Sequence, residues 1–431
     1  MKIAVIGSGI SGLSAAWLLS CNHKVTLFEA EKRLGGHTHT VDVTVDGVTH
    51  PVDTGFLVYN DRTYPNLLAL FEMLGVRWAE SDMSFSVQAE AEGVEWAGTD
   101  LASVFAQKRN LLSPRFWGML YDIVRFNREG TRLARDDHAA TGTLGEFLAK
   151  RSYGQAFRDW YLIPMAAAIW STPAENIRDF PLRTFLRFCH NHGLLQITDR
   201  PRWRTVVGGG REYVARMATA ITEVRASTPV VAVIRQENGV LVTTALGREE
   251  HFDQVVLACH SDQALGLLAD ASSQERSILG AITYQPNFAV LHTDESFLPR
   301  NPKAWAAWNY HAGAGLPGSR PVALSYLINK LQPLPFEKPV IVTLNPHRPP
   351  APDKVQGTFK HSHPLFDEAA VAAQGQLDSI QGKAHVWFCG AWTRYGFHED
   401  GLLSGIRVAR SLGVHAPWQK VEVQKVEVQD E

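Results

Sequence analysis

The chain has 431 residues, of which 45% are hydrophobic and 20% are charged, and its formal net charge is −2. This length suits two domains, and the composition is that of an ordinary globular protein. The small net charge excludes wholesale nucleic-acid binding, and no apolar run is long enough for a membrane-spanning helix. Four scattered cysteines without a CxxC pair indicate reduced thiols. We therefore expect a cytoplasmic protein, or one that is peripheral on a membrane.

The first thirty-six residues predict a dinucleotide-binding unit. Lys2–Gly7 (KIAVIG) is an apolar, β-branched run typical of a buried parallel strand, and Lys24–Glu29 (KVTLFE) is a second strand. Between them lie the turn Gly7-Ser8-Gly9-Ile10-Ser11-Gly12 and a helical stretch. In such a unit the glycines allow a tight turn, the approach of a pyrophosphate and close helix–strand packing. Glu29 ends the second strand, where a carboxylate can accept hydrogen bonds from a ribose diol.

The segment Arg33-Leu34-Gly35-Gly36 follows the second strand at once. In this order of motifs the sequence resembles the flavin-containing amine oxidoreductase superfamily, which includes amine oxidases, phytoene-desaturase-like enzymes and protoporphyrinogen oxidase. The resemblance implies FAD, because nicotinamide-binding domains generally lack the Arg-x-Gly-Gly segment. The FAD-binding residues that the motifs and the resemblance imply are Gly7, Ser8, Gly9, Ile10, Ser11, Gly12, Glu29, Ala30, Arg33, Gly35, Gly36, His37, Thr38, Gly55, Val230, Gly390, Ala391, Leu402 and Leu403.

The fold class that we predict is α/β. A Rossmann-like FAD-binding domain, built on a parallel sheet with an antiparallel β excursion, is expected to be interleaved with an α+β substrate domain. We assign residues 1–59, 205–260 and 384–418 to the FAD-binding domain. Residues 60–204 and 261–383 are assigned to the substrate or cap domain, and residues 419–431 to a flexible tail.

Several strands can be placed within this scheme. Val41–Val52 predicts a hairpin around Asp46-Gly47, and Pro229–Val233 should pair with Gly239–Val242. His251–Cys259 is typical of one nearly continuous buried strand, and residues 261–383 predict an antiparallel sheet. No carboxylate or cysteine lies at ligand spacing around His37 and His39, so we expect no metal site.

From residue 60 to about residue 204 the pattern becomes mostly helical. Pro65–Leu74 ends at Gly75, and Ser113-Pro114 opens a helix whose apolar residues recur at helical spacing. This surface is either the solvated face of a cap helix or a face that meets anionic lipid head groups or guides a fatty carboxylate. Its basic residues are Lys108, Arg109, Arg115, Arg125, Arg128, Arg132 and Arg135.

The end of the chain carries a second glycine-rich motif. Val386–Trp392 followed by Tyr395–Gly405 resembles the superfamily's second flavin motif, in which a strand-end glycine contacts the ribitol and a helix points its N-terminus at the flavin. Amides near Leu402 and Leu403 should stabilise negative charge there. Two positions depart from the family pattern, since Ala391 replaces an acidic residue and Asp400 replaces a glycine.

Candidate catalytic residues lie in the same motif. We choose His398, with Tyr395 and Glu399, because an imidazole titrates near neutral pH. The competing interpretation is a histidine that is simply hydrogen-bonded within its loop. The segment Tyr161–Trp170 either lines a narrow apolar cavity or packs tightly as a helix. The expected substrate contacts are Trp170, Trp308, Tyr310, Trp392 and Phe397.

The chemistry implied by the resemblance is hydride transfer from a substrate to FAD. Amine oxidases of the superfamily usually place a lysine near the flavin, whereas alignment of Phe288–Phe297 puts Phe288 or Asn287 there. The sequence also looks like bacterial flavoproteins associated with fatty-acid-modifying methyltransferases. We therefore expect a small apolar substrate, fatty acyl or isoprenoid, with the electron acceptor left open. The alternatives are an amine oxidase, a flavin-dependent double-bond isomerase and a non-catalytic lipid-binding protein of the same fold.

Overall fold

The structure is a computed structural model that describes residues 1–136, 140–196, 198–312 and 323–419. A five-stranded parallel sheet, in the order β10-β2-β1-β14-β20, forms its nucleotide-binding part. Successive side chains of β1 enter different cores, Ile3 and Val5 on one face and Ala4 on the other. The strands are β1 (Lys2–Ile6), β2 (Lys24–Phe28), β10 (Glu223–Arg225), β14 (Gln254–Leu257) and β20 (Val386–Phe388).

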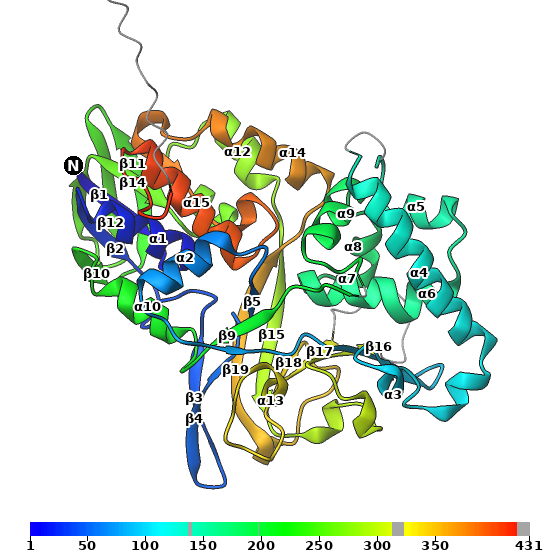
Figure 1. The fold of residues 1–431 in the computed structure, drawn as a ribbon. Coiled ribbons are helices and arrows are strands. Elements are labelled where there is room, and N and C mark those ends of the chain that lie inside the picture. Colours follow the sequence, from blue (N-terminus) through cyan, green and yellow to red (C-terminus); the bar gives the residue numbers. More distant parts are fainter. Residues whose placement is uncertain (137–139, 197, 313–322, 420–431) are drawn as a thin grey trace, which may run out of the picture.

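Both faces of this sheet are covered (Figure 1). One face packs against α1 (Ile10–Leu19), α2 (Pro65–Met73), α10 (Arg211–Ala218) and α15 (His398–Ser411). The crossing of α15 over α1 is close, because a Cβ at Gly405 would overlap Ser14 Oγ and Ser11 O. The other face packs against α11 (Ser261–Leu267), α12 (Ser273–Gly280), α14 (Glu368–Gln376) and a three-stranded antiparallel sheet.

That antiparallel sheet consists of β11 (Val230–Gln236), β12 (Gly239–Thr244) and β13 (Glu249–Phe252). The predicted pairing of β11 with β12 is confirmed. The prediction of one continuous strand over His251–Cys259 is wrong, because the chain turns at Asp253 and divides it between β13 and β14. The Asp253 carboxylate accepts a hydrogen bond from Lys2 N at 2.6 Å, which ties this turn to the start of β1.

A seven-stranded sheet, in the order β19-β15-β18-β17-β16-β7-β8, forms the floor of the substrate part. The mostly helical pattern predicted for residues 60–204 misses three strands, two of which join this sheet beside β16 (Trp308–Ala312), β17 (Ala323–Leu327) and β18 (Ile341–Leu344). β7 runs parallel to β16, so the two substrate segments share one sheet. The remaining strands are β7 (Phe85–Ala89), β8 (Val94–Ala97), β15 (Tyr284–His292) and β19 (Val355–Pro364).

Two small sheets connect the parts. The predicted hairpin is present as β3 (Thr40–Val45) and β4 (Val48–Asp53). β9 (Trp203–Val206) lies between β5 (Tyr59–Asn60) and β6 (Trp78–Glu80). The prediction of an α/β fold with a parallel sheet and antiparallel additions is therefore confirmed, while the exact domain boundaries remain predictions.

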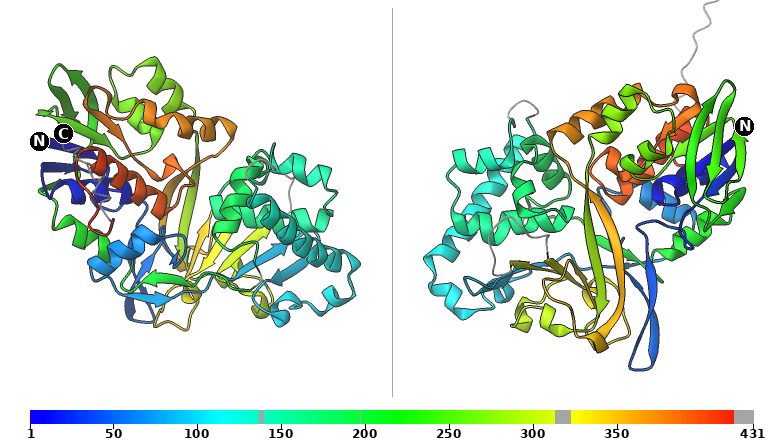
Figure 2. Two further views of the ribbon diagram at one scale, coloured as in Figure 1. Left: turned by 45° about the horizontal axis from the view of Figure 1, so that its top comes forward. Right: turned by 180° about the vertical axis from the view of Figure 1, so that it is seen from behind.

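A helical cap stands beside the nucleotide-binding part, and the long strands β15 and β19 run between them (Figure 2). Its longest helix starts at Pro114 as predicted, because Ser113 Oγ accepts a hydrogen bond from Phe116 N at 3.3 Å. Phe116, Phe126 and Phe185 are fully buried in its core. The helices are α3 (Leu101–Val104), α4 (Pro114–Ala134), α5 (Leu144–Lys150), α6 (Gln155–Phe157), α7 (Ile163–Trp170), α8 (Ala174–Arg178) and α9 (Leu182–Asn191), and α13 (Ile328–Leu331) lies below the sheet.

In the described part of the chain, no helix is both long enough and apolar enough to cross a bilayer. The predicted tail begins within the described residues at Gln419, and residues 420–431 lie outside them.

Candidate functional site

A cavity of about 800 Å³ extends from the glycine turn after β1 to the helical cap and the seven-stranded sheet. Most residues predicted to bind FAD line it, although they come from six separate stretches of the chain. Those that line it are Gly7, Ser8, Gly9, Ile10, Ser11, Glu29, Ala30, Gly35, Gly36, His37, Gly55, Val230, Gly390 and Ala391.

The three glycines of the first motif have different environments. Gly7 has φ +105°, and a Cβ there would lie 2.8 Å from Ala258 O. A Cβ at Gly12 would overlap Gly7 O, so this glycine permits α1 to pack on β1. A Cβ at Gly9 would meet nothing within 4 Å, and Gly9 lines the cavity. The turn therefore leaves an open approach to its backbone where a diphosphate group would bind, at the N-terminus of α1.

Glu29 and Arg33 shape the loop around this turn. One Glu29 carboxylate oxygen accepts hydrogen bonds from Ser8 N at 2.9 Å and Ser8 Oγ at 2.5 Å. The other carboxylate oxygen accepts a hydrogen bond from Glu31 N at 2.9 Å, and Glu29 lines the cavity where a ribose group would bind. Arg33 does not line the cavity, and its guanidinium donates to Gly36 O at 2.7 Å and Thr38 O at 3.2 Å. Its place in the motif is thus to hold the Gly35–Gly36 turn.

The second motif places the N-terminus of α15 beside the cavity, but not at the predicted residues. Leu402 and Leu403 lie in the second turn of α15 and do not line the cavity. Their amides belong to the helical hydrogen-bond ladder, because Gly401 N already donates to Phe397 O at 3.0 Å. The amides without an intrahelical acceptor are those of the first turn, which begins at His398. The amides that could stabilise negative charge therefore lie about one helical turn before the predicted Leu402 and Leu403.

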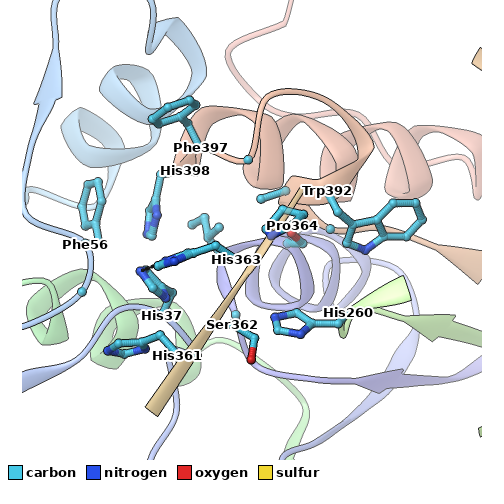
Figure 3. A pocket seen from close by; sticks show the side chains of 18 of the residues that line it. His37, Phe56, His260, His361, Ser362, His363, Pro364, Trp392, Phe397 and His398 are labelled. Carbon is cyan, nitrogen blue, oxygen red and sulfur yellow. Dashed lines mark hydrogen bonds between the residues drawn. The ribbon is translucent and has the colours of Figure 1, made fainter. Parts of the chain in front are cut away.

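His398 lines the cavity, but its environment argues against the predicted acid/base role. Its Nε2 lies 3.0 Å from Thr38 Oγ1 and 2.9 Å from the Tyr213 hydroxyl. Its ring stacks on Phe56 with centroids 3.6 Å apart (Figure 3). Burial lowers the pKa of His398 to about 3, so the imidazole is neutral at physiological pH. This favours the competing interpretation of a hydrogen-bonded, positioning histidine. Thr38, which was predicted to bind FAD, does not line the cavity, and its hydroxyl instead contacts His398.

Glu399 does not line the cavity and has a structural position. Its carboxylate accepts hydrogen bonds from Asn66 N at 3.0 Å, Asn66 Nδ2 at 2.6 Å and Leu67 N at 2.9 Å, at the N-terminus of α2. The side chain therefore caps one helix from the first turn of another. Nothing in this geometry supports the predicted catalytic role of Glu399. Tyr395, the third candidate, does line the cavity, and burial raises the pKa of its hydroxyl.

Three histidines gather in the cavity wall, His37 exposed and His361 and His363 partly exposed, and sequence reasoning considered only His37. The ring of His37 lies 4.6 Å from that of His361 and 5.0 Å from that of His363 (Figure 3). His363 Nε2 is 3.5 Å from His37 Nε2, and His363 Nδ1 is 2.8 Å from Asn287 Nδ2. Although these rings are open to the cavity, desolvation by the surrounding walls is the main cause that lowers the pKa of all three, to about 3 for His361 and His363. The His-Ser-His sequence in β19 carried a signal, because alternate residues share one face of a strand.

The substrate end of the cavity is apolar and aromatic. Among the described residues that line the whole cavity there is no lysine or arginine, and the carboxylates, Glu29 and Glu31, belong to the nucleotide end. Tyr310, predicted to contact substrate, is buried outside the lining. The segment Tyr161–Trp170 does both predicted things, since α7 is tightly packed and its last two residues face the cavity. Besides the polar Ser171 and His192, the substrate end is lined by Met83, Ile169, Trp170, Phe188, Leu194, Trp308, Tyr326, Val342, Leu344, Phe366, Trp392 and Phe397.

Sequence alignment expected Phe288 or Asn287 at the position of the amine oxidase lysine. Neither lines the cavity, since Phe288 is about half exposed and Asn287 is buried in hydrogen bonds to its neighbours. Ala289, one residue further along β15, does line it. Within the described ranges, no group of three or more histidines, cysteines or acids has the arrangement to hold a metal ion.

Comparison with known proteins gives consistent results. The model of the family described as flavin containing amine oxidoreductase matches residues 10–333. L-amino-acid oxidase from Pseudechis australis is 45% identical over 47 residues, which are 11% of this chain and only 9% of that protein. Cyclohexylamine oxidase from Brevibacterium oxydans IH-35A shares the fold with a TM-score of 0.69 at 16% identity, over 96% of this chain and 99% of that chain. The CLA-producing fatty acid isomerase from P. acnes shares it with a TM-score of 0.65 at 14% identity, over 95% and 98%.

Proposed function

The chain belongs to the flavin containing amine oxidoreductase family, and on that premise we propose that it oxidises or desaturates a lipid-like substrate, fatty acyl or isoprenoid. Family membership makes it an FAD-dependent oxidoreductase. It also sets aside the alternative of a non-catalytic lipid-binding protein. The substrate class is our inference from the cavity.

The residues present fit FAD. The open backbone at Gly9, the Glu29 carboxylate and Val230 line one end of the cavity, where the diphosphate, ribose and adenine would be held. Gly390 and the first turn of α15 lie at the other end of the cofactor region. When bound, the flavin accepts a hydride from the substrate. The chain's own part is to hold the substrate, exclude water and carry away the proton that the neighbouring carbon loses.

One observation carries the substrate proposal, namely the absence of charge among the described residues at the substrate end. An ammonium group buried there would have no carboxylate partner, and an unpaired buried charge is costly. The histidines add no positive charge at neutral pH, because desolvation lowers the pKa of His192 to about 4 and that of His363 to about 3. Apolar walls such as Trp170 and Phe366 instead match an alkyl chain.

Neutral imidazoles are the groups available to take up a proton. His37 and His363 lie side by side in the cavity wall, and Asn287 fixes the outer nitrogen of His363. We assign this pair the transfer of the proton released when a carbon–carbon double bond forms. Desolvation lowers the pKa of both imidazoles, as it does for His398, so this assignment rests on their place in the cavity wall and not on their basicity.

Two other activities remain as candidates. Cyclohexylamine oxidase has a similar fold, which keeps amine oxidation as the first alternative. The fatty acid isomerase has a similar fold too, so double-bond isomerisation of a fatty chain without net oxidation is the second. At this level of identity the fold alone is shared, and the cavity lining favours an apolar chain over an amine.

The test is to mix the purified, flavin-loaded protein with candidate substrates without oxygen and to measure flavin reduction as the loss of flavin absorbance. We expect fatty acids, acyl esters or isoprenoids to bleach the flavin, and primary and secondary amines to leave it oxidised. Ile169→Glu places a carboxylate at the substrate end, and Ile169→Gln is its uncharged match. The Glu variant should slow bleaching by the lipid more than the Gln variant. Rapid bleaching by an amine, with every lipid inert, would reject the proposal in favour of amine oxidation.

A further inference from the structure

An apolar surface is concentrated on one edge of the helical cap. Fourteen large hydrophobic side chains are exposed in the described residues, and six of them lie within the short stretch from Leu101 to Val124. Leu112 is 87% exposed and Tyr121 68% exposed. Isolated exposed apolar residues are ordinary, but a contiguous group marks an interaction surface. We define the docking face as Leu111, Leu112, Trp117, Tyr121 and Val124.

The docking face is held together by α4 and the turn before it. Trp117, Tyr121 and Val124 are spaced four and three residues apart, so they share one side of the helix. The opposite side buries Phe116, Met119 and Phe126 in the cap core. Trp117 Nε1 donates to Leu111 O at 2.9 Å, which fixes the turn carrying Leu111 and Leu112 against the start of α4. The face therefore belongs to ordered structure and is not a frayed end.

The exposed charges that α4 itself carries are positive, whereas Asp100 before α3 and Asp136 after α4 are exposed acids. The two acids of α4 point inward, where Asp122 accepts a hydrogen bond from Gly154 N at 2.8 Å and Glu129 pairs with Arg151 at 2.9 Å. Arg125, expected from sequence on the basic surface, instead lies 3.4 Å from the Asp122 carboxylate and stacks over the Tyr153 ring at 3.9 Å. The exposed cations of α4 and of the turn before it are Lys108, Arg109, Arg115, Arg128 and Arg132.

An apolar stripe with a tryptophan and a tyrosine, edged by arginines and without an exposed acid on α4, matches the interface of an anionic bilayer. Aromatic side chains favour the head-group level, leucines enter the acyl boundary and arginines meet the phosphates. A two-fold contact with a second copy is less suitable, because it would bring the same arginines against one another. Figures 1 and 2 place α3 and the start of α4 at the end of the molecule away from β1, so the nucleotide-binding part does not obstruct this face.

We propose that the docking face binds the surface of an anionic phospholipid bilayer. This inference does not require that a lipid be the substrate, and it concerns residues outside the cavity lining. Attachment is peripheral and depends on both parts of the surface. Its electrostatic part weakens with salt, because exposed charges are screened over about 10 Å at 0.1 M ionic strength.

The experiment is co-sedimentation of the flavin-loaded protein with vesicles of phosphatidylcholine, alone or mixed with phosphatidylglycerol. We expect binding to the mixed vesicles and much less to phosphatidylcholine alone. The double variants Leu112→Ser/Tyr121→Ser and Arg128→Glu/Arg132→Glu should each weaken binding roughly tenfold or more while keeping their flavin absorbance. The matched controls are Leu246→Ser, which removes an exposed leucine from the nucleotide-binding part, and Arg276→Glu, which reverses an exposed arginine on α12.

Each result decides the matter. Equal loss of binding in the controls would show that attachment is not specific to this face, and absence of binding to the mixed vesicles would reject the proposal outright. A wild-type dimer that Leu112→Ser/Tyr121→Ser converts to a monomer, without vesicle binding, would assign the face to self-association. Because the anaerobic flavin reduction by lipids is measured separately from vesicle binding, failure of membrane binding is distinguishable from failure of the proposed oxidation.

Discussion

Gly9→Ala and Gly12→Ala form a pair that separates cofactor binding from folding. A Cβ at Gly9 meets no protein atom within 4 Å, and its φ of −62° is open to alanine. The loss of a glycine cap and the reduced entropy of the unfolded chain are both below about 1 kcal/mol and oppose each other. Gly9→Ala should therefore leave the melting temperature of the flavin-free protein almost unchanged.

The methyl group added at Gly9 would lie beside the main-chain turn where we expect the diphosphate of FAD to bind. If it meets FAD instead of protein, an overpacking cost of about 1–3 kcal/mol falls on the complex alone. This corresponds to a dissociation constant for FAD raised about 5- to 150-fold. Gly12→Ala reverses the pattern, because its Cβ would overlap Gly7 O and lie 3.0 Å from Ala258 Cβ in the folded chain itself. We expect it to destabilise the flavin-free protein at the upper end of the same range.

The assay is fluorescence titration of FAD into deflavinated protein, combined with thermal unfolding before FAD is added. The reasoning is refuted if Gly9→Ala binds FAD with unchanged affinity. It is also refuted if Gly9→Ala lowers the melting temperature of the flavin-free protein as much as Gly12→Ala does.

Two further predictions concern residues with buried polar groups. Glu399→Ala removes the acceptor of three hydrogen bonds at the start of α2, so it should destabilise the fold by about 1.5–3 kcal/mol in urea unfolding while the folded fraction keeps its turnover number; a selective loss of turnover would restore a catalytic role. His361, His363 and His398 have pKa values of about 3 in the folded chain, below the ordinary 6.5, so unfolding takes up protons between these limits. Stability is therefore complete above pH 6.5 and falls as the pH is lowered, by up to about 1.4 kcal/mol per pH unit for each imidazole. Unfolding midpoints at fixed FAD concentration should fall between pH 7 and pH 5, less steeply in His398→Gln, and equal slopes in the variant and the parent would contradict the assignment.

The parts of the site that were predictable are encoded in consecutive residues. The glycine turn and Glu29 lie within one strand–helix–strand unit, so their relative positions follow from local geometry. The apolar periodicity of α4 and its serine cap likewise predicted its start. In these cases the physical cause is short-range, and the tertiary structure adds little to it.

The unpredicted parts depend on contacts between distant segments. The meeting of His37 with His363 joins residues 326 positions apart, and it exists because β19 reaches the loop after β2. Glu399 was predicted to be catalytic because it lies in the second flavin motif, but that motif does not reveal its hydrogen-bond partners on α2. Arg125 looked like a surface cation because helical spacing alone does not reveal a buried acid three residues before it. Side-chain partners across elements are therefore where pattern-based inference fails.

The central claim, oxidation of an apolar chain, is tested most directly by a single anaerobic turnover of the flavin-loaded protein with a fatty acyl or isoprenoid substrate, with mass analysis of the lipid. Both electrons must then reside in the flavin, and the account predicts a product lighter by two hydrogens, formed in the same amount as the flavin that is reduced. A product of unchanged mass, with the flavin oxidised at the end, would contradict oxidation and assign the chain to isomerisation. An unaltered lipid in every case, beside an oxidised amine, would contradict the substrate assignment itself.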